Sequence, residues 1–215
     1  MTGYPRPPVA LSRGRSFTSR QESVLAELEE IFLQEGFRRL TIQELAARLR
    51  CSRRTLYDLA PSKDELVALV VDRLLQGIGR QAMARARALD DPLQRVHAYM
   101  STASRALTRA ARAFSADVAG QPGIRRLFQE HYRFATSIAA VLIQEGMDGG
   151  TFRETDARLV AEVIYASLDR LQDPEVLEHL GRTNAEAFQE LFDLIVHGLS
   201  RPSEDRARPG DRSSS

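Results

Sequence analysis

The sequence predicts an all-α protein, with an N-terminal three-helix helix-turn-helix domain and a larger C-terminal helical domain. Apolar residues recur at spacings of three and four through most of the chain, which is the period of an amphipathic helix. No long stretch alternates apolar and polar residues as a half-buried strand does. We divide the chain into a basic tail (1–18), a helix-turn-helix domain (19–62), a helical domain (63–200) and a second tail (201–215).

The first helix is predicted from a start signal and a stop signal. Ser19-x-x-Glu22 has the pattern of a capping box, in which the hydroxyl bonds the N3 amide and the glutamate bonds the cap amide. Gly36 supplies the left-handed position with which many helices end. We therefore expect a helix over residues 20–35.

Two shorter helices are predicted next. The capping box Thr41-x-x-Glu44 begins one helix, which stops at residues 50–51. Ser52 begins the other, which ends before Pro61. Two short helices separated by a turn of this length predict a helix-turn-helix.

Positive charge is concentrated on this domain. Residues 38–63 contain seven cations and two carboxylates, a formal charge of +5, whereas the whole chain carries +1. Such a patch is typical of a protein that binds a polyanion. The second helix opens with Arg53 and Arg54, and arginines in the major groove of DNA bond phosphates or the O6/N7 edge of guanine.

Residues 31–66 resemble the DNA-binding domain of the TetR (tetracycline-repressor-like) transcriptional regulators. The matching pieces are Phe32 with Gly36-Phe37, Thr41-x-x-Glu44-Leu45-Ala46, Ser52-x-x-Thr55-Leu56-Tyr57 and Pro61-Ser62-Lys63-x-x-Leu66. The rest of the chain is similar to the family only in length and helical character.

The expected DNA-binding residues follow from the helix pattern and from this resemblance. Ser52 should cap the recognition helix, with Arg53, Arg54 and Thr55 in its first turn. The resemblance assigns phosphate contacts to Thr41, Tyr57 and Lys63. One arginine is expected to read a base and the other to hold the backbone, without an assignment of which does which.

Three departures from the family pattern leave the operator sequence open. Arg50 stands where the family commonly has a turn glycine, and Arg54 replaces a frequent glycine of the recognition helix. Residues 58–60 replace an aromatic-rich stretch. Asp58 either repels phosphate or accepts a hydrogen bond from a cytosine amino group.

The remainder of the chain predicts further helices. Their expected positions are 64–89, a helix starting at 91–92, a helix between the breaks at 121–123 and 148–150, a helix up to about 173–174, and a last one after Thr183-x-x-Glu186. The resemblance makes this a ligand-binding and dimerisation domain.

The resemblance implies a small-molecule effector, which we expect to be mainly apolar. Polar groups on mostly apolar helix faces suit a cavity between helices. For each candidate the alternative is an ordinary core or rim residue with its own hydrogen-bond partner. The candidates are His97, Met100, Ser104, Phe128, His131, Tyr132 and Tyr165.

A homodimer is expected from the apolar final helices, because the corresponding helices of the family form a four-helix bundle with their two-fold mates. The alternative is that their side chains serve the intrachain core. A two-fold dimer places two recognition helices about 34–36 Å apart, so each reads one half of a palindrome. The candidate interface residues are Val163, Leu171, Phe188, Leu191, Phe192, Ile195 and Leu199.

Several features have two interpretations at this stage. The composition of tail 1–18 predicts disorder, and the alternative is a minor-groove arm with Arg13, Arg15 and Arg20. Cys51 is interpreted as a packing residue, and the alternative is a redox-sensitive thiol beside arginines. Glu175 and His179 lie four apart, which is usually a surface contact.

Competing functions lack their sequence motifs. The four histidines have no H-E-x-x-H spacing, a second cysteine for a thiolate site or disulfide is absent, and G-x-S-x-G, P-loop and G-x-G-x-x-G patterns are absent. No apolar run approaches the roughly 20 residues of a membrane span. We therefore expect no catalytic residue, metal, cofactor or membrane partner, and a cytoplasmic location.

The sequence thus predicts a ligand-responsive transcriptional regulator that binds double-stranded operator DNA. Repression, with release from a palindromic operator by a small molecule, is the mode that the resemblance implies. The alternatives are a helical dimeric scaffold without DNA binding and an enzyme.

Overall fold

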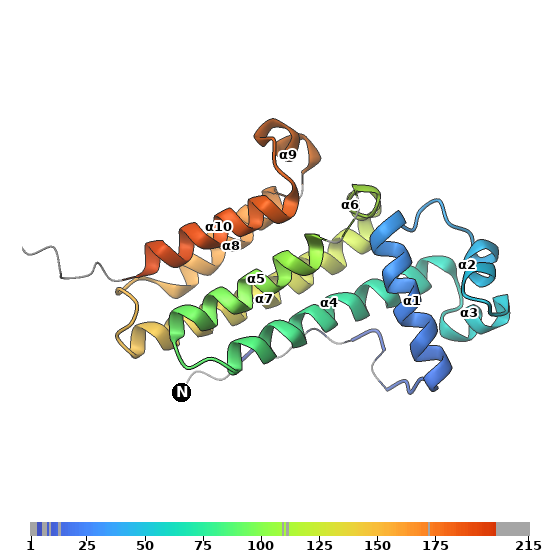
Figure 1. Ribbon diagram of the computed structural model, residues 1–215, viewed down its shortest axis with the longest axis horizontal. Helices are drawn as coiled ribbons and strands as arrows, with labels where there is room; N and C mark the ends of the chain where they lie inside the picture. The colour runs from blue at the N-terminus through green and yellow to red at the C-terminus, as the bar shows by residue number, and fades with distance from the viewer. Residues whose placement is uncertain are drawn as a thin grey trace, which may run out of the picture.

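The computed structural model describes residues 4–5, 8, 10–12, 14–108, 110, 112–171 and 173–200. Figure 1 shows that these residues form helices joined by short connections, and the all-α prediction is confirmed. The helices of the described part are α1 (Ser19–Glu35), α2 (Ile42–Arg48), α3 (Arg53–Leu59), α4 (Lys63–Arg87), α5 (Pro92–Thr108), α6 (Arg112–Gly120), α7 (Pro122–Asp148), α8 (Ala157–Arg170), α9 (Pro174–Leu180) and α10 (Asn184–Leu199).

Helices α1, α2 and α3 form the N-terminal domain around a small apolar core. Each contributes leucines that are wholly or almost wholly buried, and α1 adds Phe32. The fully buried leucines are Leu25, Leu28, Leu45, Leu56 and Leu59. Because α2 and α3 are each only seven residues long, they are too short to be stable alone, and burial in this core stabilises them.

The first helix begins one residue earlier than the sequence pattern suggested. Thr18, rather than Ser19, is the N-cap, and its side chain accepts a hydrogen bond from the backbone N–H of Gln21. Gln21 completes the box by accepting from the backbone N–H of Thr18 at 2.9 Å. Glutamine serves in a capping box as glutamate does, so the pair at 18 and 21 competes with the expected pair at 19 and 22.

The turn between α2 and α3 has a left-handed residue that is not glycine. Arg50 has a φ of 49°, and its backbone N–H donates to Ala47 O at 3.2 Å. Cys51 follows it, half-buried against the core of the domain. Burial raises the pKa of the Cys51 thiol, and the nearby Arg20 charge opposes that rise. This environment favours the packing interpretation of Cys51 over the redox one.

Helix α4 belongs to the packing of both domains. Its first half buries Leu66, Val67 and Val70, and Arg73 forms ion pairs with Glu22 at 2.9 Å and Glu29 at 3.2 Å on α1. The helix also packs against α5 and α7. Figure 1 shows α4 extending from the helix-turn-helix to the far end of the bundle.

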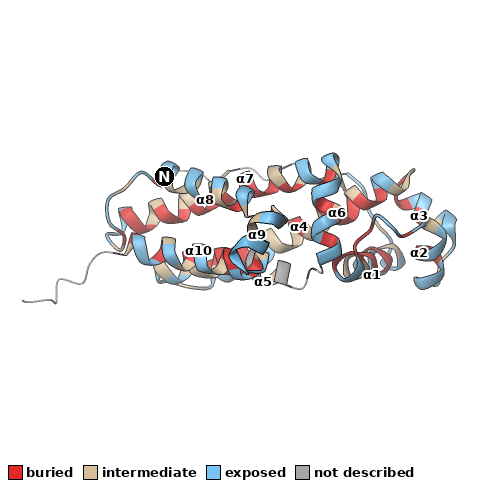
Figure 2. Ribbon diagram, turned by 90° about the horizontal axis from the view of Figure 1, so that it is seen from above, coloured by how far each residue is buried: buried red, intermediate tan, exposed pale blue. Residues whose placement is uncertain are grey.

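The C-terminal domain is built around α4, α5 and α7. Helix α10 packs on α5, and α8 packs on α7. Figure 2 shows the buried faces of these helices turned inward and the exposed faces turned to solvent. Helix α6, which was not predicted from the sequence, packs against α7 and also against α1 of the other domain.

Helices α8 and α10 run antiparallel, with a hydrogen bond near each end. The backbone N–H of Arg153, before α8, donates to Leu199 O at 3.0 Å. At the other end Asn184 Nδ2 donates to Leu171 O at 2.9 Å. Figure 1 shows both helices on the same side of the domain, beyond α5 and α7.

The described residues before α1 make contacts with the rest of the molecule. Tyr4 donates its hydroxyl to Glu145 Oε1 at 3.0 Å, and the backbone N–H of Leu11 donates to Asp72 Oδ2 at 2.9 Å. Figure 1 shows this segment alongside α4. Tyr4 and Leu11 therefore contact α7 and α4, the disorder expected for residues 1–18 stays a prediction, and tail 201–215 lies outside the described residues. Among the described residues, no helix is long and apolar enough to cross a membrane.

The left-handed turn predicts a stabilising substitution. A Cβ in this conformation costs about 1–2 kcal/mol, and the extra freedom of glycine in the unfolded chain costs about 0.5–1 kcal/mol. Arg50→Gly should therefore raise the free energy of unfolding by roughly 0.5–1 kcal/mol, measured by urea denaturation at fixed protein concentration. Arg50→Ala removes the same charge but keeps the Cβ, and should give no gain. Equal changes in both variants would contradict strain at this turn.

Candidate nucleic-acid interface

Helix α3 has polar side chains on its outer face and buried leucines on its inner face. Ser52 caps it as predicted, with Oγ accepting the Thr55 backbone N–H at 3.1 Å and the two hydroxyls 3.0 Å apart. Leu56 and Leu59 anchor the inner face. Arg53, Arg54 and Tyr57 are exposed on the outer face, Tyr57 to 50%. This helix therefore offers two guanidinium groups and a phenol to a partner.

The start of α2 is fixed by the predicted capping box. Thr41 Oγ1 accepts the Glu44 backbone N–H at 3.2 Å, and Glu44 Oε2 accepts both the backbone N–H and the hydroxyl of Thr41 at 2.7 and 2.8 Å. These bonds, first that from the Thr41 backbone, lower the pKa of Glu44. Thr41 is exposed at an ordered helix N-terminus, which is a favourable place for a phosphate.

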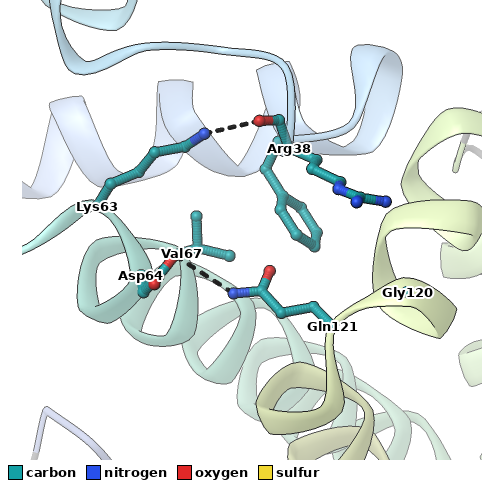
Figure 3. A pocket seen from close by; sticks show the side chains of 7 residues that line it. Arg38, Lys63, Asp64, Val67, Gly120 and Gln121 are labelled. Atoms are coloured by element: carbon teal, nitrogen blue, oxygen red, sulfur yellow. Dashed lines mark hydrogen bonds between the residues drawn. The ribbon is translucent and has the colours of Figure 1, made fainter.

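Lys63, the first residue of α4, is held by the other side of the domain. Its Nζ donates to Arg38 O at 2.8 Å, and two of its three N–H donors stay available for a phosphate. Figure 3 shows this bond beside a pocket of about 210 Å³ between the two domains. The pocket is lined by Phe37, Arg38, Lys63, Asp64, Val67, Gly120 and Gln121.

Two arginines that the sequence offered for a minor-groove arm bind the helix-turn-helix itself. Arg20 Nη2 donates to Leu49 O at 2.9 Å at the end of α2. Arg15 Nη2 donates to Leu59 O at 2.6 Å at the end of α3. Carbonyls at helix C-termini lack intrahelical partners and attract cations, so both contacts stabilise the short helices. Arg13 lies outside the described residues.

Some arginines of the helix-turn-helix domain are ion-paired within the chain, and others remain available to a partner. Arg48 Nη1 lies 2.7 Å from both carboxylate oxygens of Glu35, so its charge is largely compensated. Arg39, Arg53 and Arg54 are exposed and form no ion pair within the part of the chain that the structure describes. The uncompensated cations thus include both arginines of the recognition helix.

Four of the expected effector residues are buried in the C-terminal domain, namely Met100, Phe128, His131 and Tyr132. The Tyr132 ring packs against Phe128 at 6.0 Å and against Phe188 of α10 at 6.3 Å between centroids. His131 Nε2 lies 3.0 Å from Asp72 Oδ1 of α4, and both side chains are buried. These residues place polar groups inside an aromatic core.

The other effector candidates lie elsewhere. His97 Nε2 is 3.4 Å from Asp193 Oδ1 on a half-exposed face. Tyr165 accepts a hydrogen bond from Arg133 Nε at 3.1 Å, and the Arg133 guanidinium lies over its ring. The side chain of Ser104 lies outside the described part. Sequence reasoning missed Tyr99, a buried phenol whose pKa is raised by burial, as that of Tyr132 is.

The expected dimer residues divide into two groups. Phe188, Phe192 and Leu199 are buried in the core of their own chain, while Leu171, Leu191 and Ile195 are half-buried. Val163 is 50% exposed. Two leucines that the prediction did not include are more exposed still, Leu159 of α8 at 61% and Leu194 of α10 at 71%. These three exposed side chains lie on α8 and α10.

Comparisons with known protein families agree with this architecture. The model of bacterial regulatory proteins of the tetR family matches residues 24–70, which span most of α1 to the first turns of α4. The model of the C-terminal domain of BetI-type transcriptional repressors matches residues 93–199, from α5 to α10. A comparison with curated proteins found no match.

Solved structures of regulators have the same fold over most of this chain. A putative transcriptional regulator from Saccharomonospora viridis, in complex with choline, is 20% identical, with a TM-score of 0.67 over 85% of this chain and 98% of its own. A transcriptional regulator from Cytophaga hutchinsonii is 16% identical, with a TM-score of 0.67 over 86% and 100%. A TetR-family regulator from Agrobacterium tumefaciens is 15% identical, with a TM-score of 0.64 over 85% and 98%. The chain therefore belongs to the tetR family of bacterial regulatory proteins and is a DNA-binding transcriptional regulator.

Proposed function

We propose that this regulator is a repressor that binds a palindromic operator as a homodimer and leaves it when a small molecule binds the C-terminal domain. The observation that carries the DNA-binding part is the outer face of α3. Arg53, Arg54 and Tyr57 are exposed on this face, while the leucines of the opposite face are buried. Both arginines are uncompensated among the described residues, as direct readout of guanine requires.

A homodimer is supported by the exposed leucines of α8 and α10. Leu159, Val163 and Leu194 expose apolar side chains on two adjacent antiparallel helices. A two-fold partner that packs the same two helices against them would bury this surface in a four-helix arrangement. The half-buried Leu191 and Ile195 extend the same face, while Phe188 and Phe192 support it from inside.

An effector site is supported by the buried residues between α5 and α7. Met100, Phe128 and Tyr132 would line such a site with apolar and aromatic groups, and His131 and Tyr99 would supply polar groups. The Saccharomonospora viridis regulator was solved with choline, and aromatic rings bind quaternary ammonium groups through cation–π contacts. An apolar molecule or an organic cation of this kind suits the site. Release of DNA requires that it binds the DNA-incompetent geometry more tightly than the competent one.

A helical dimeric scaffold without DNA binding is the remaining alternative. TetR-family proteins are transcriptional regulators rather than enzymes, which removes the enzyme alternative. A gel shift of the purified protein on genomic DNA fragments at several salt concentrations distinguishes scaffold from regulator. Selective retention of some fragments supports the regulator, and no retention at low salt contradicts it.

Lys63 should contribute to the affinity for all DNA sequences alike. Lys63→Ala removes one phosphate contact from each subunit, so the slope of log K against log salt should fall by about two units for a dimer. Lys63→Arg keeps the charge and the donors and should keep the slope. Binding titrations at four salt concentrations measure it, and an unchanged slope in the alanine variant would remove Lys63 from the phosphate contacts.

Arg53 and Arg54 should differ in their response to lysine. Lysine keeps the charge but lacks the planar fork that bonds guanine O6 and N7 together. At the base-reading arginine, the substitution should weaken specific binding by about 1–3 kcal/mol per half-site and leave non-specific binding nearly unchanged. At the other position both kinds of DNA should respond equally. Competition titrations with operator and random duplexes measure the difference, and equal responses at both positions would contradict base readout by this pair.

The outer face of α10 should be required for assembly. Leu194→Glu places a charge on a side chain that is exposed in the single chain, so the subunit should fold, but in a dimer interface the charge would be buried without a partner. We expect a folded monomer in sedimentation velocity, with loss of specific DNA binding. Ala84→Glu adds the same charge on an exposed position of α4 and should leave the dimer intact. A dimeric Leu194→Glu variant would show that the interface lies elsewhere.

A further inference from the structure

Asp117 of α6 bonds the main chain of the helix-turn-helix domain. Its Oδ2 accepts the backbone N–H of Phe37 at 2.7 Å and that of Arg38 at 2.8 Å. Phe37 is only 1% exposed, so water cannot readily replace the carboxylate at its amide. Hydrogen bonds to an ionised acceptor are stronger than neutral ones, and a buried amide left without a partner is costly.

The turn that Asp117 binds, residues 36–38 (the α1–α2 turn), lies in direct contact with α6. A Cβ on Gly36 would lie 2.5 Å from Asp117 Oδ2 and 3.2 Å from the carbonyl of Ala113, so only glycine fits this approach. The rings of Phe37 and Phe114 meet edge to face at 5.9 Å. The position of the turn relative to the C-terminal domain is thus determined by packing as well as by hydrogen bonds.

The same turn holds Lys63 at the start of α4. Arg38 gives its N–H to Asp117 and receives the Lys63 ammonium at its carbonyl oxygen, at 2.8 Å. Figure 3 shows Lys63 and Arg38 joined in this way at the edge of the pocket between the domains. Two polar groups of one residue therefore connect a carboxylate of the C-terminal domain with a cation of the DNA-binding face.

We propose that Asp117 is a positioning residue for DNA binding, which acts through the α1–α2 turn to hold the Lys63 ammonium where it meets a phosphate. The proposal rests on the proposed phosphate contact of Lys63. Asp117 itself is negative and lies outside the helix-turn-helix, so it does not bind DNA. Its effect on DNA affinity comes from the placement of Arg38 O, the acceptor that orients Lys63.

Charge and positioning predict opposite results when Asp117 is replaced. Removal of a carboxylate makes the protein more positive, and charge alone then strengthens binding to DNA. Loss of the two hydrogen bonds releases the α1–α2 turn and Lys63 with it, which weakens binding. The sign of the change in affinity therefore separates the two effects.

The test compares three variants of the full chain by operator titration at several salt concentrations. Asp117→Ala should bind about tenfold more weakly, as expected when hydrogen bonds of ordinary strength are lost. Asp117→Asn keeps an oxygen that accepts N–H groups, so it should restore part of the loss. Glu130→Ala removes the same charge from an exposed position on α7 and should bind as tightly as the unchanged protein or more tightly.

A double substitution tests the route through Lys63. In a Lys63→Ala background, Asp117→Ala should cause little further loss and no further fall of the salt slope, because both changes remove the same contact. If the losses add, or if Asp117→Ala binds as tightly as Glu130→Ala, the proposal is overturned while the function of Lys63 stands. If Lys63→Ala alone leaves the salt slope unchanged, the proposed phosphate contact of Lys63 is contradicted, and the proposal for Asp117 loses its basis. Circular dichroism checks folding, and Asp117→Asn decides if Asp117→Ala does not fold.

Discussion

The packing of α4 against both domains is the constraint on which the rest of the structure depends. A continuous helix of 25 residues is a rod of roughly 37 Å. Its first residue is Lys63, at the proposed DNA face, and it packs against α5 and α7, which carry most of the effector candidates. Each buried leucine or valine near its start contributes about 1.5–3 kcal/mol, so the helix cannot separate from the helix-turn-helix without a large loss. A shift of α4 in one domain must therefore displace the other.

The buried pair Asp72–His131 joins this rod to α7 at its middle. Asp72 also accepts the backbone N–H of Leu11, so one carboxylate connects α4, α7 and the N-terminal segment. Removal of one partner from such a pair leaves a buried polar group unsatisfied, whereas replacement of both by apolar residues is often tolerated. The pair fixes the position of α4 along α7 more specifically than apolar contacts alone, because its geometry permits one alignment.

Local signals explain what the sequence predicted of this molecule. Ser52, Thr41 and Thr183 each cap the helix expected of them, because an N-cap hydrogen bond joins residues only three apart. Helix α6 was missed because its nine residues bury only Phe114 and Val118, too few for a periodic pattern. The partners of Asp117, Arg15 and Arg20 lie 29 to 80 residues away in sequence, and no local pattern indicates them.

The sequence also did not predict which apolar side chains of the last helices are buried and which are exposed. Phe192 and Leu194 are two residues apart in one apolar helix, yet Phe192 is buried and Leu194 is 71% exposed. Which of them faces the chain's own core depends on how α10 lies on α5, a tertiary choice. The positions of His97 and Tyr165 could not be predicted for the same reason, because an apolar stripe does not define which of its two edges faces the core.

The decisive measurement for dimeric operator binding is the stoichiometry and footprint of the protein on a genomic fragment that it selects. A dimeric regulator should give two chains per site and a protected region of two inverted half-sites, with centres about 34–36 Å apart or a multiple of that distance. A single chain per site, a footprint without two-fold symmetry, or no selective binding would contradict dimeric operator binding.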